Sequence, residues 1–230
     1  MRGVRVATMV AAGVAALWAA APAAAQPKEL PAKVVTIGGK AETFKKGETK
    51  WDPAKLRAEL DQGDGVRTLI SGRLALATTS GQVVRLAHLT QVFFKDGEAA
   101  PDAGPAPTRI RLDSGWLWVA VLPGGATVNR IEVDAGPVTV TVRGGGAGIR
   151  VNADGGVLVR LYHGAAVCVG PGAQRQWERQ LADDQELLVS TAGVPGEIRR
   201  LTRDKLDAAW VKSNEELDHA GGFGGKPPKK

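Results

Sequence analysis

The sequence predicts a single, mainly β domain, rolled or β-helix-like, followed by one C-terminal α-helix. Short runs of β-patterned residues continue from about residue 32 to residue 198, with Gly-rich or Pro-rich segments between them. About 165 residues can form one sizeable core and are too few for two independent ones. After these runs, within residues 199–220, apolar residues recur at the spacing of an α-helix. The strand pattern alone equally permits a β-sandwich.

The first 25 residues have the three parts of a secretory signal peptide. Two arginines precede an apolar run from Val6 to Ala21, and three alanines end at Ala25. We expect cleavage between Ala25 and Gln26 and export to the periplasm. An uncleaved signal would instead anchor the chain in the inner membrane, because about 17 apolar residues approach the lower limit for spanning a bilayer.

The charge of the chain is mildly basic. Lys and Arg total 30 against 24 Asp and Glu, a net charge of +6 that falls to +4 when the two arginines of the signal are removed. The basic residues are spread among acids, whereas nucleic-acid binders gather them in a patch. We therefore expect no nucleic-acid binding. No later segment is apolar enough to cross a membrane, so we also expect no stable membrane insertion after cleavage.

Several strands and turns can be placed in order. Residues 73–79 and 82–88 form the clearest hairpin, because Gly81 between them can take the positive φ of a tight turn. Residues 138–142 alternate Val and Thr, which predicts buried valines and solvent-facing threonines. Residues 152–156 read as a turn into the next strand, and the three prolines of residues 99–107 predict a surface loop.

The strand from Trp116 to Val121 is apolar on both faces. It should lie between two layers of structure or present Trp116 and Trp118 to a partner. The two indoles, about 7 Å apart on one face, could stack sugar rings or contact a partner protein. Core packing is the alternative for both. Trp51 and Trp177 are expected to cover the ends of the β core.

One helix is expected within residues 199–220, with Thr202 as its N-cap and Gly221-Gly222 as its end. Leu206, Trp210, Ser213 and Leu217 follow at helical spacing, so we expect the helix to dock through Trp210. Residues 221–230 have the composition of a disordered tail.

The order of these features resembles the FecR domain family of bacterial envelope proteins. Residues 60–68 are similar to the family's opening phrase L-x-x-G-D-x-v-x-T. Residues 72–86, 110–121 and 158–169 follow in the order of its hairpin, its strand pair with a central Gly, and its later repeat. The resemblance covers residues 40–198, preceded by a linker and first strand at 26–39. It implies a rolled β fold and a sensory or binding role in the envelope.

The sequence departs from the family at two points. Gly145 follows Val142-Arg143-Gly144 where the family has Gly-Thr. Some FecR-like sigma regulators are thought to be cut at that bond by the Thr hydroxyl, and Gly145 has none. The signal peptide stands where the best-known members carry a cytoplasmic segment and a transmembrane helix, so we expect no anti-sigma role. Residues 144–148 are expected to form a flexible β connection, since a strand follows instead of the helix a phosphate loop needs.

The residues with reactive side chains form no catalytic, metal or cofactor motif. Cys168 has apolar neighbours and is predicted to be buried in a strand. The three histidines lack metal-ligand spacing, and Asp183, Asp184 and Glu186 are expected to form a solvated turn. We therefore expect no enzyme activity, no cofactor and no metal site.

These observations predict a non-enzymatic periplasmic binding, scaffold or sensory module for another envelope protein. The alternative is a glycan or cell-wall binding module that uses exposed Trp116 and Trp118.

Overall fold

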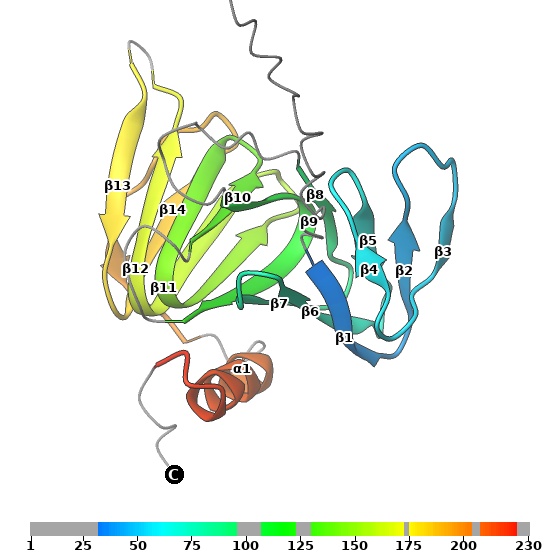
Figure 1. Cartoon of the computed structure of the whole chain (residues 1–230). Coiled ribbons are helices and arrows are strands. Elements are labelled where there is room, and N and C mark those ends of the chain that lie inside the picture. The colour runs from blue at the N-terminus through cyan, green and yellow to red at the C-terminus, as the bar shows by residue number, and fades with distance from the viewer. Residues whose placement is uncertain (1–31, 96–106, 123–129, 173–174, 204–207, 225–230) are drawn as a thin grey trace, which may run out of the picture.

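The computed structural model describes residues 32–95, 107–122, 130–172, 175–203 and 208–224. The predicted cleavage site at Ala25 and Gln26 and most of the proline-rich segment 99–107 lie outside them. The described chain is mainly β with one C-terminal helix, which confirms the predicted fold class (Figure 1). Within it, no helix combines the length and the hydropathy needed to span a bilayer.

The elements follow one another in this order. They are β1 (Ala32–Gly38), β2 (Ala41–Phe44), β3 (Trp51–Pro53), β4 (Glu59–Leu60), β5 (Gly65–Thr68), β6 (Arg73–Thr78), β7 (Val83–Leu86), β8 (Gln91–Phe94), β9 (Thr108–Val121), β10 (Ile131–Ala135), β11 (Val138–Val151), β12 (Val157–Gly170), β13 (Trp177–Leu181), β14 (Gln185–Val189), β15 (Arg199–Arg200) and α1 (Ala208–Ala220).

The strands form one hydrogen-bonded, bent sheet (Figure 1). The long strands β9, β11 and β12 each have 14 residues and change neighbours along their length. What we call the first half-sheet has the order β3-β2-β5-β8-β9-β10-β11-β12-β13. The second half-sheet has the order β4-β1-β6-β7-β9-β11-β12-β14-β15. The three long strands run through both halves.

Glycines lie where the long strands change neighbours. Gly115, Gly145 and Gly164 have φ angles of +87°, +89° and +100°, which side chains rarely tolerate. Gly145 and Gly164 are paired across β11 and β12. A Cβ on Gly145 would overlap the carbonyl oxygen of His163, and one on Gly164 would overlap that of Gly144. Residues 144–148 are therefore an internal part of β11 and not the expected connection between strands.

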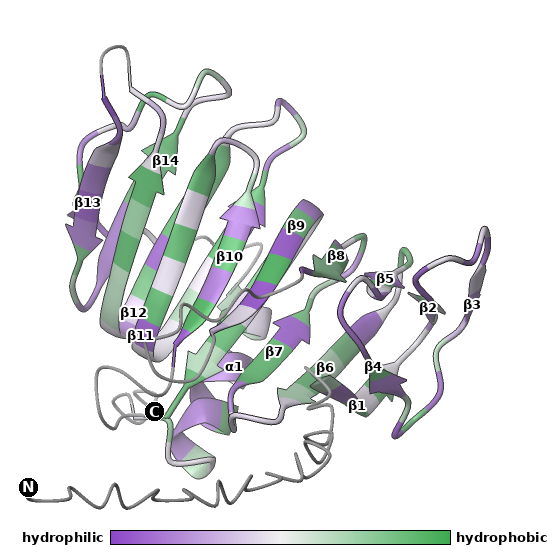
Figure 2. Cartoon of the chain, turned by 45° about the horizontal axis from the view of Figure 1, so that its top comes forward, coloured by the Kyte–Doolittle hydropathy of each residue, from purple (hydrophilic) through white to green (hydrophobic). Residues whose placement is uncertain are grey.

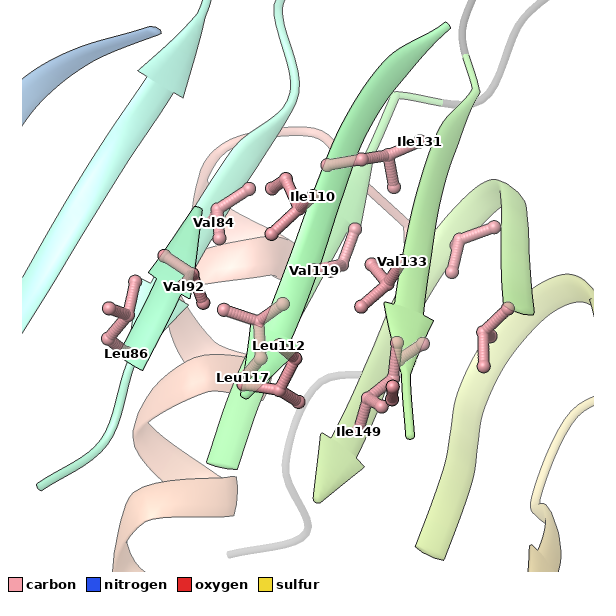
Figure 3. Close-up of a cluster of buried hydrophobic side chains, with 14 of the residues drawn as sticks. Val84, Leu86, Val92, Ile110, Leu112, Leu117, Val119, Ile131, Val133 and Ile149 are labelled. Carbon is pink, nitrogen blue, oxygen red and sulfur yellow. The ribbon is translucent and has the colours of Figure 1, made fainter. Parts of the chain in front are cut away.

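The core lies on the inner face of the bent sheet. Side chains of both half-sheets meet there in one cluster, and Ile110, Leu112, Leu117 and Val119 of β9 all belong to it (Figure 3). Hydrophobic and hydrophilic residues alternate along the first part of β9 (Figure 2), because successive side chains of a strand point to opposite faces. Each such buried aliphatic side chain stabilises the fold by about 1.5–3 kcal/mol.

The predicted local elements are present. β6 and β7 form the hairpin expected around Gly81, whose φ is +82°. The valines of residues 138–142 are buried and the two threonines between them are partly exposed. The turn at residues 152–156 closes with a 2.8 Å hydrogen bond from the Asn152 N–H to the Gly156 carbonyl.

The Gly-Asp pair of the FecR-like opening phrase has a structural role. The buried Asp64 carboxylate accepts hydrogen bonds from Lys45 Nζ at 2.6 Å, the Asp61 N–H at 2.8 Å and the Lys46 N–H at 3.0 Å. These bonds fix the loop before β5 to the loop after β2. The motif therefore organises two turns.

Candidate interaction surfaces

Trp116 and Trp118 project from the outer face of the second half-sheet and lie beneath α1. Their exposed fractions are 7% and 0%. Trp116 packs on Trp210 of α1 with ring centroids 4.2 Å apart, and Trp118 stacks on Tyr162 at 4.5 Å. The strand is thus enclosed on both sides, one of the two outcomes its sequence predicted. We call this surface, made of Ala87, Trp116, Trp118, Ala120 and Tyr162, the tryptophan face.

Two glycines of β11 make room on the tryptophan face. A Cβ on Gly148 would lie 3.0 Å from Trp116 Nε1, and one on Gly146 would lie 2.7 Å from Asp218 Oδ2 of α1. Side chains here would displace the indole or the helix. The glycine-rich sequence of β11 therefore permits the close approach of α1.

A carboxylate of α1 is buried against this face. Asp218 is fully buried, and its Oδ1 lies 2.5 Å from Arg85 Nη1 of β7. Its Oδ2 accepts a 2.8 Å hydrogen bond from Trp118 Nε1. His163 Nε2 lies 3.6 Å from the same oxygen, and within the described part of the chain this buried nitrogen has no hydrogen-bond partner. An ion pair this deep requires such additional donors, because burial removes the water that would solvate both charges.

The contact face of α1 differs from the predicted stripe. Trp210 packs on the face as expected, but Leu217 is 50% exposed. The buried residues are Val211, Asn214 and Asp218. The hydrophobic pattern failed because two of these three are polar. Leu206 lies outside the described residues.

The two ends of the predicted helical segment also have specific partners. The Thr202 N–H and hydroxyl, expected to cap the helix, both donate to the Glu186 carboxylate. Gly221 and Gly222 end the helix as predicted, and the Phe223 N–H donates to the Asp218 carbonyl at 2.9 Å. Phe223 packs on the tryptophan face, so the prediction of a disordered tail from residue 221 onward is wrong at this residue.

A second aromatic cluster lies on the outer face of the first half-sheet, and sequence reasoning missed it. Phe44 of β2, Trp51 of β3 and Phe93 of β8 have ring centroids 5.4–6.0 Å apart. Gly65 of β5 lies between them, where a Cβ would be 2.6 Å from Phe93 Cε1 and 3.1 Å from Trp51 Cη2. The missing side chain lets the rings converge. All three rings are partly exposed.

Two arginines stack on this cluster. The Arg67 guanidinium lies 4.5 Å from the centre of the Trp51 ring, and that of Arg111 lies 4.7 Å from the centre of Phe93. Carboxylates hold both: Arg67 Nε donates to Glu42 at 2.6 Å, and Arg111 Nε to Asp113 at 2.7 Å. We call Phe44, Trp51, Phe93, Arg67 and Arg111 the aromatic–arginine surface.

The missed cluster had a sequence signal. Arg67 and Phe93 each lie between two buried residues of their strands, so their outward direction could have been read from the period of two. Trp51 belongs to this surface and not to an end of the core. Trp177, by contrast, packs against the core as expected, and its Nε1 donates to the Gly193 carbonyl at 2.7 Å.

Comparison with known proteins adds little to this geometry. No protein-family model and no curated protein matches the chain. Two crystal structures of a candidate anti-sigma factor from Parabacteroides distasonis align with it at a TM-score of 0.49 and 15% identity. Each alignment covers 64% of this chain and 64% of that protein, so it spans less than two thirds of the known structure. Similarity at this level gives no evidence of function.

The reactive side chains outside the two surfaces occupy structural positions. Cys168 is fully buried in β12, and desolvation raises the pKa of its thiol to about 12. Asp183 and Asp184 are exposed in a turn as predicted, and Asp183 Oδ1 accepts the Gly164 N–H at 2.7 Å. Glu186, predicted to be a solvated acid of the same turn, instead lies in β14 and pairs with Arg160 at 3.1 Å. Within the described ranges, no group of three His, Cys, Asp or Glu side chains could hold a metal ion. The two aromatic surfaces are therefore the strongest candidates for function.

Proposed function

We propose that this chain is a non-enzymatic periplasmic module of FecR-domain type that binds another envelope protein through the aromatic–arginine surface. The observation that carries the proposal is the stacking of Arg67 and Arg111 on partly exposed rings. In this role the chain would act as a scaffold or sensor. Export by the predicted signal peptide would place the surface in the periplasm.

The composition and order of this surface suit protein recognition. Aromatic residues and arginine are enriched at protein interfaces and in their binding hot spots. The rings of Phe44, Trp51 and Phe93 pack on one another, and carboxylates fix both guanidinium groups. Such side chains lose little conformational entropy when a partner binds. The partner would place apolar side chains against the rings.

The FecR-type assignment rests on the roles that its motifs have in the fold. Asp64 of the opening phrase organises two turns, and Gly115 and Gly164 of the later motifs lie where long strands change neighbours. The non-enzymatic assignment is supported by the burial of Cys168, whose thiol stays protonated at neutral pH.

The glycan alternative depended on exposed Trp116 and Trp118. Both indoles lie beneath α1, so a sugar ring has no access to them in this structure. A protein partner at the aromatic–arginine surface does not require α1 to move.

Photo-crosslinking in intact cells tests the proposal. A photoreactive amino acid replaces Lys50, which is exposed beside Trp51 and is not one of the stacking residues, and in a separate control it replaces Lys212, which is exposed on α1. We expect one discrete adduct with an envelope protein from position 50, absent at position 212 and lost when Trp51→Ala is added. Recovery of the monomer alone from position 50 would contradict the proposal.

A further inference from the structure

The contact between α1 and the tryptophan face has the composition of an interface between proteins. On the sheet side it offers two indoles and the Tyr162 ring, with Arg85 at the edge. On the helix side, Trp210 and Val211 pack on the face, whereas Asn214 and Asp218 are polar. Aromatic residues and arginine mark binding hot spots. The sheet therefore supplies three aromatic rings and Arg85, and α1 supplies one indole and one recognised carboxylate.

The recognition of this carboxylate is specific. Arg85 Nη1 and Trp118 Nε1 bind different oxygens of Asp218, at 2.5 Å and 2.8 Å. Gly146 leaves the space in which the carboxylate lies. A helix without an acidic residue at this point would leave the Arg85 charge largely buried and without its counter-charge, which is unfavourable. The face thus selects helices with one inward carboxylate.

The fit of α1 is incomplete at one buried atom. Among the described residues, His163 Nε2 has no hydrogen-bond partner, although it lies 3.6 Å from Asp218 Oδ2. A buried polar group without a partner is unfavourable, because burial removes the water that would otherwise bind it. A different helix that also gave His163 an acceptor would therefore bind this face better than α1 does.

We infer that the tryptophan face is a second protein-binding surface, which α1 covers in the free chain and an acidic helix of a partner protein occupies in its place. The partner helix presents one carboxylate to Arg85 and Trp118, as Asp218 does. α1 then acts as an intramolecular competitor. The measured association constant is the intrinsic association constant multiplied by the fraction of chains in which α1 leaves the face uncovered. This surface is distinct from the aromatic–arginine surface, and the two proposals can fail separately.

The probe for this surface is a labelled synthetic peptide of residues 208–224, added to the full-length chain. In Asp218→Asn the competing helix is weakened, while the peptide still carries its own carboxylate. We expect the peptide to bind Asp218→Asn at least tenfold more tightly than wild type. Glu216→Gln removes an exposed carboxylate of the same helix and should behave as wild type. The Asp218→Asn form of the peptide, or an added Arg85→Gln in the chain, should reduce binding at least tenfold.

Three outcomes would overturn the inference. One is equal peptide binding by wild type and Asp218→Asn, and another is peptide binding that ignores Arg85. The third is a dimer of Asp218→Asn on size-exclusion chromatography, which would assign the face to a second copy of this chain.

Hydrogen exchange of the wild-type chain gives a test without any variant. We expect the amides of α1 to exchange at least tenfold faster than those of residues 116–121 in β9, because the helix opens while the sheet stays folded. Equal rates would mean that α1 leaves only when the whole domain unfolds, and the inference would fail.

Discussion

Trp118 on β9 donates its indole N–H to Asp218 on α1, 100 residues further along the chain, at 2.8 Å. The pair joins the sheet to the C-terminal helix at a point where both side chains are fully buried. It explains why a helix with few buried apolar residues has a defined position. It also makes Asp218 the residue whose replacement should loosen α1 most.

Asp218→Ala should reduce the free energy of unfolding by about 3 kcal/mol, because it leaves the largely buried Arg85 without its counter-charge. Urea denaturation measures this change. Iodide quenching of tryptophan fluorescence should rise as α1 separates from the indoles. Glu216→Ala, on the exposed side of α1, should change the stability by less than about 0.5 kcal/mol. Similar losses in both variants would show that Asp218 does not hold the helix.

Gly145→Thr should destabilise the fold by about 2 kcal/mol or more, because Gly145 has a φ of +89° and its Cβ would overlap the His163 carbonyl. Gly144→Thr is the matched control, since no atom lies within 4 Å of a Cβ placed there. Thermal unfolding of the two variants should show a clearly lower midpoint for position 145. Equal midpoints would show that position 145 does not require glycine for steric reasons.

Trp51→Ala should weaken capture of the partner protein by about thirtyfold, the effect of losing a hot-spot residue worth about 2 kcal/mol. The indole carries the stacked Arg67 and contacts both phenylalanine rings of the surface. Pull-down with the partner identified by crosslinking at position 50 measures the loss. Leu56→Ala, at an exposed leucine of a loop, should leave capture unchanged. Unchanged capture by Trp51→Ala would exclude this surface.

Stability should fall between about pH 9 and pH 12, because burial raises the pKa of the Cys168 thiol from 9.0 to about 12. The unfolded chain releases this proton first, so rising pH favours unfolding in that window. Burial also raises the pKa of Tyr162, which acts in the same direction above pH 10. Urea titrations of wild type and Cys168→Ala isolate the thiol: the variant should lose less stability between pH 8 and pH 10. Equal losses would contradict the burial of the thiol.

Much of the fold could be predicted from the sequence because its signals are local. The period of two at residues 138–142 and the turn glycine at position 81 act within a few residues. The course of β11 through residues 144–148 could not be predicted in this way. A run of glycines is typical of a loop, and only the facing Gly164 of β12 shows why the strand continues and bends there.

The candidate surfaces were harder to predict because they depend on contacts between distant residues. Trp116 and Trp118 lie on a strand that is apolar on both faces. This pattern does not decide whether the two indoles are buried under another element or exposed to a partner. The choice depended on Asp218, a charged residue that hydrophobic periodicity assigns to solvent. Likewise, Phe44, Trp51 and Phe93 come together only through the pairing of four strands around Gly65.

The strand β9 contributes Arg111 to one surface and Trp118 to the other, with the bend at Gly115 between them. Any linkage that this strand provides must be reciprocal: a partner that shifts the β9 backbone at one end changes the affinity at the other by the same factor. One continuous strand thus joins the surface for which we propose an envelope partner to the surface that α1 covers.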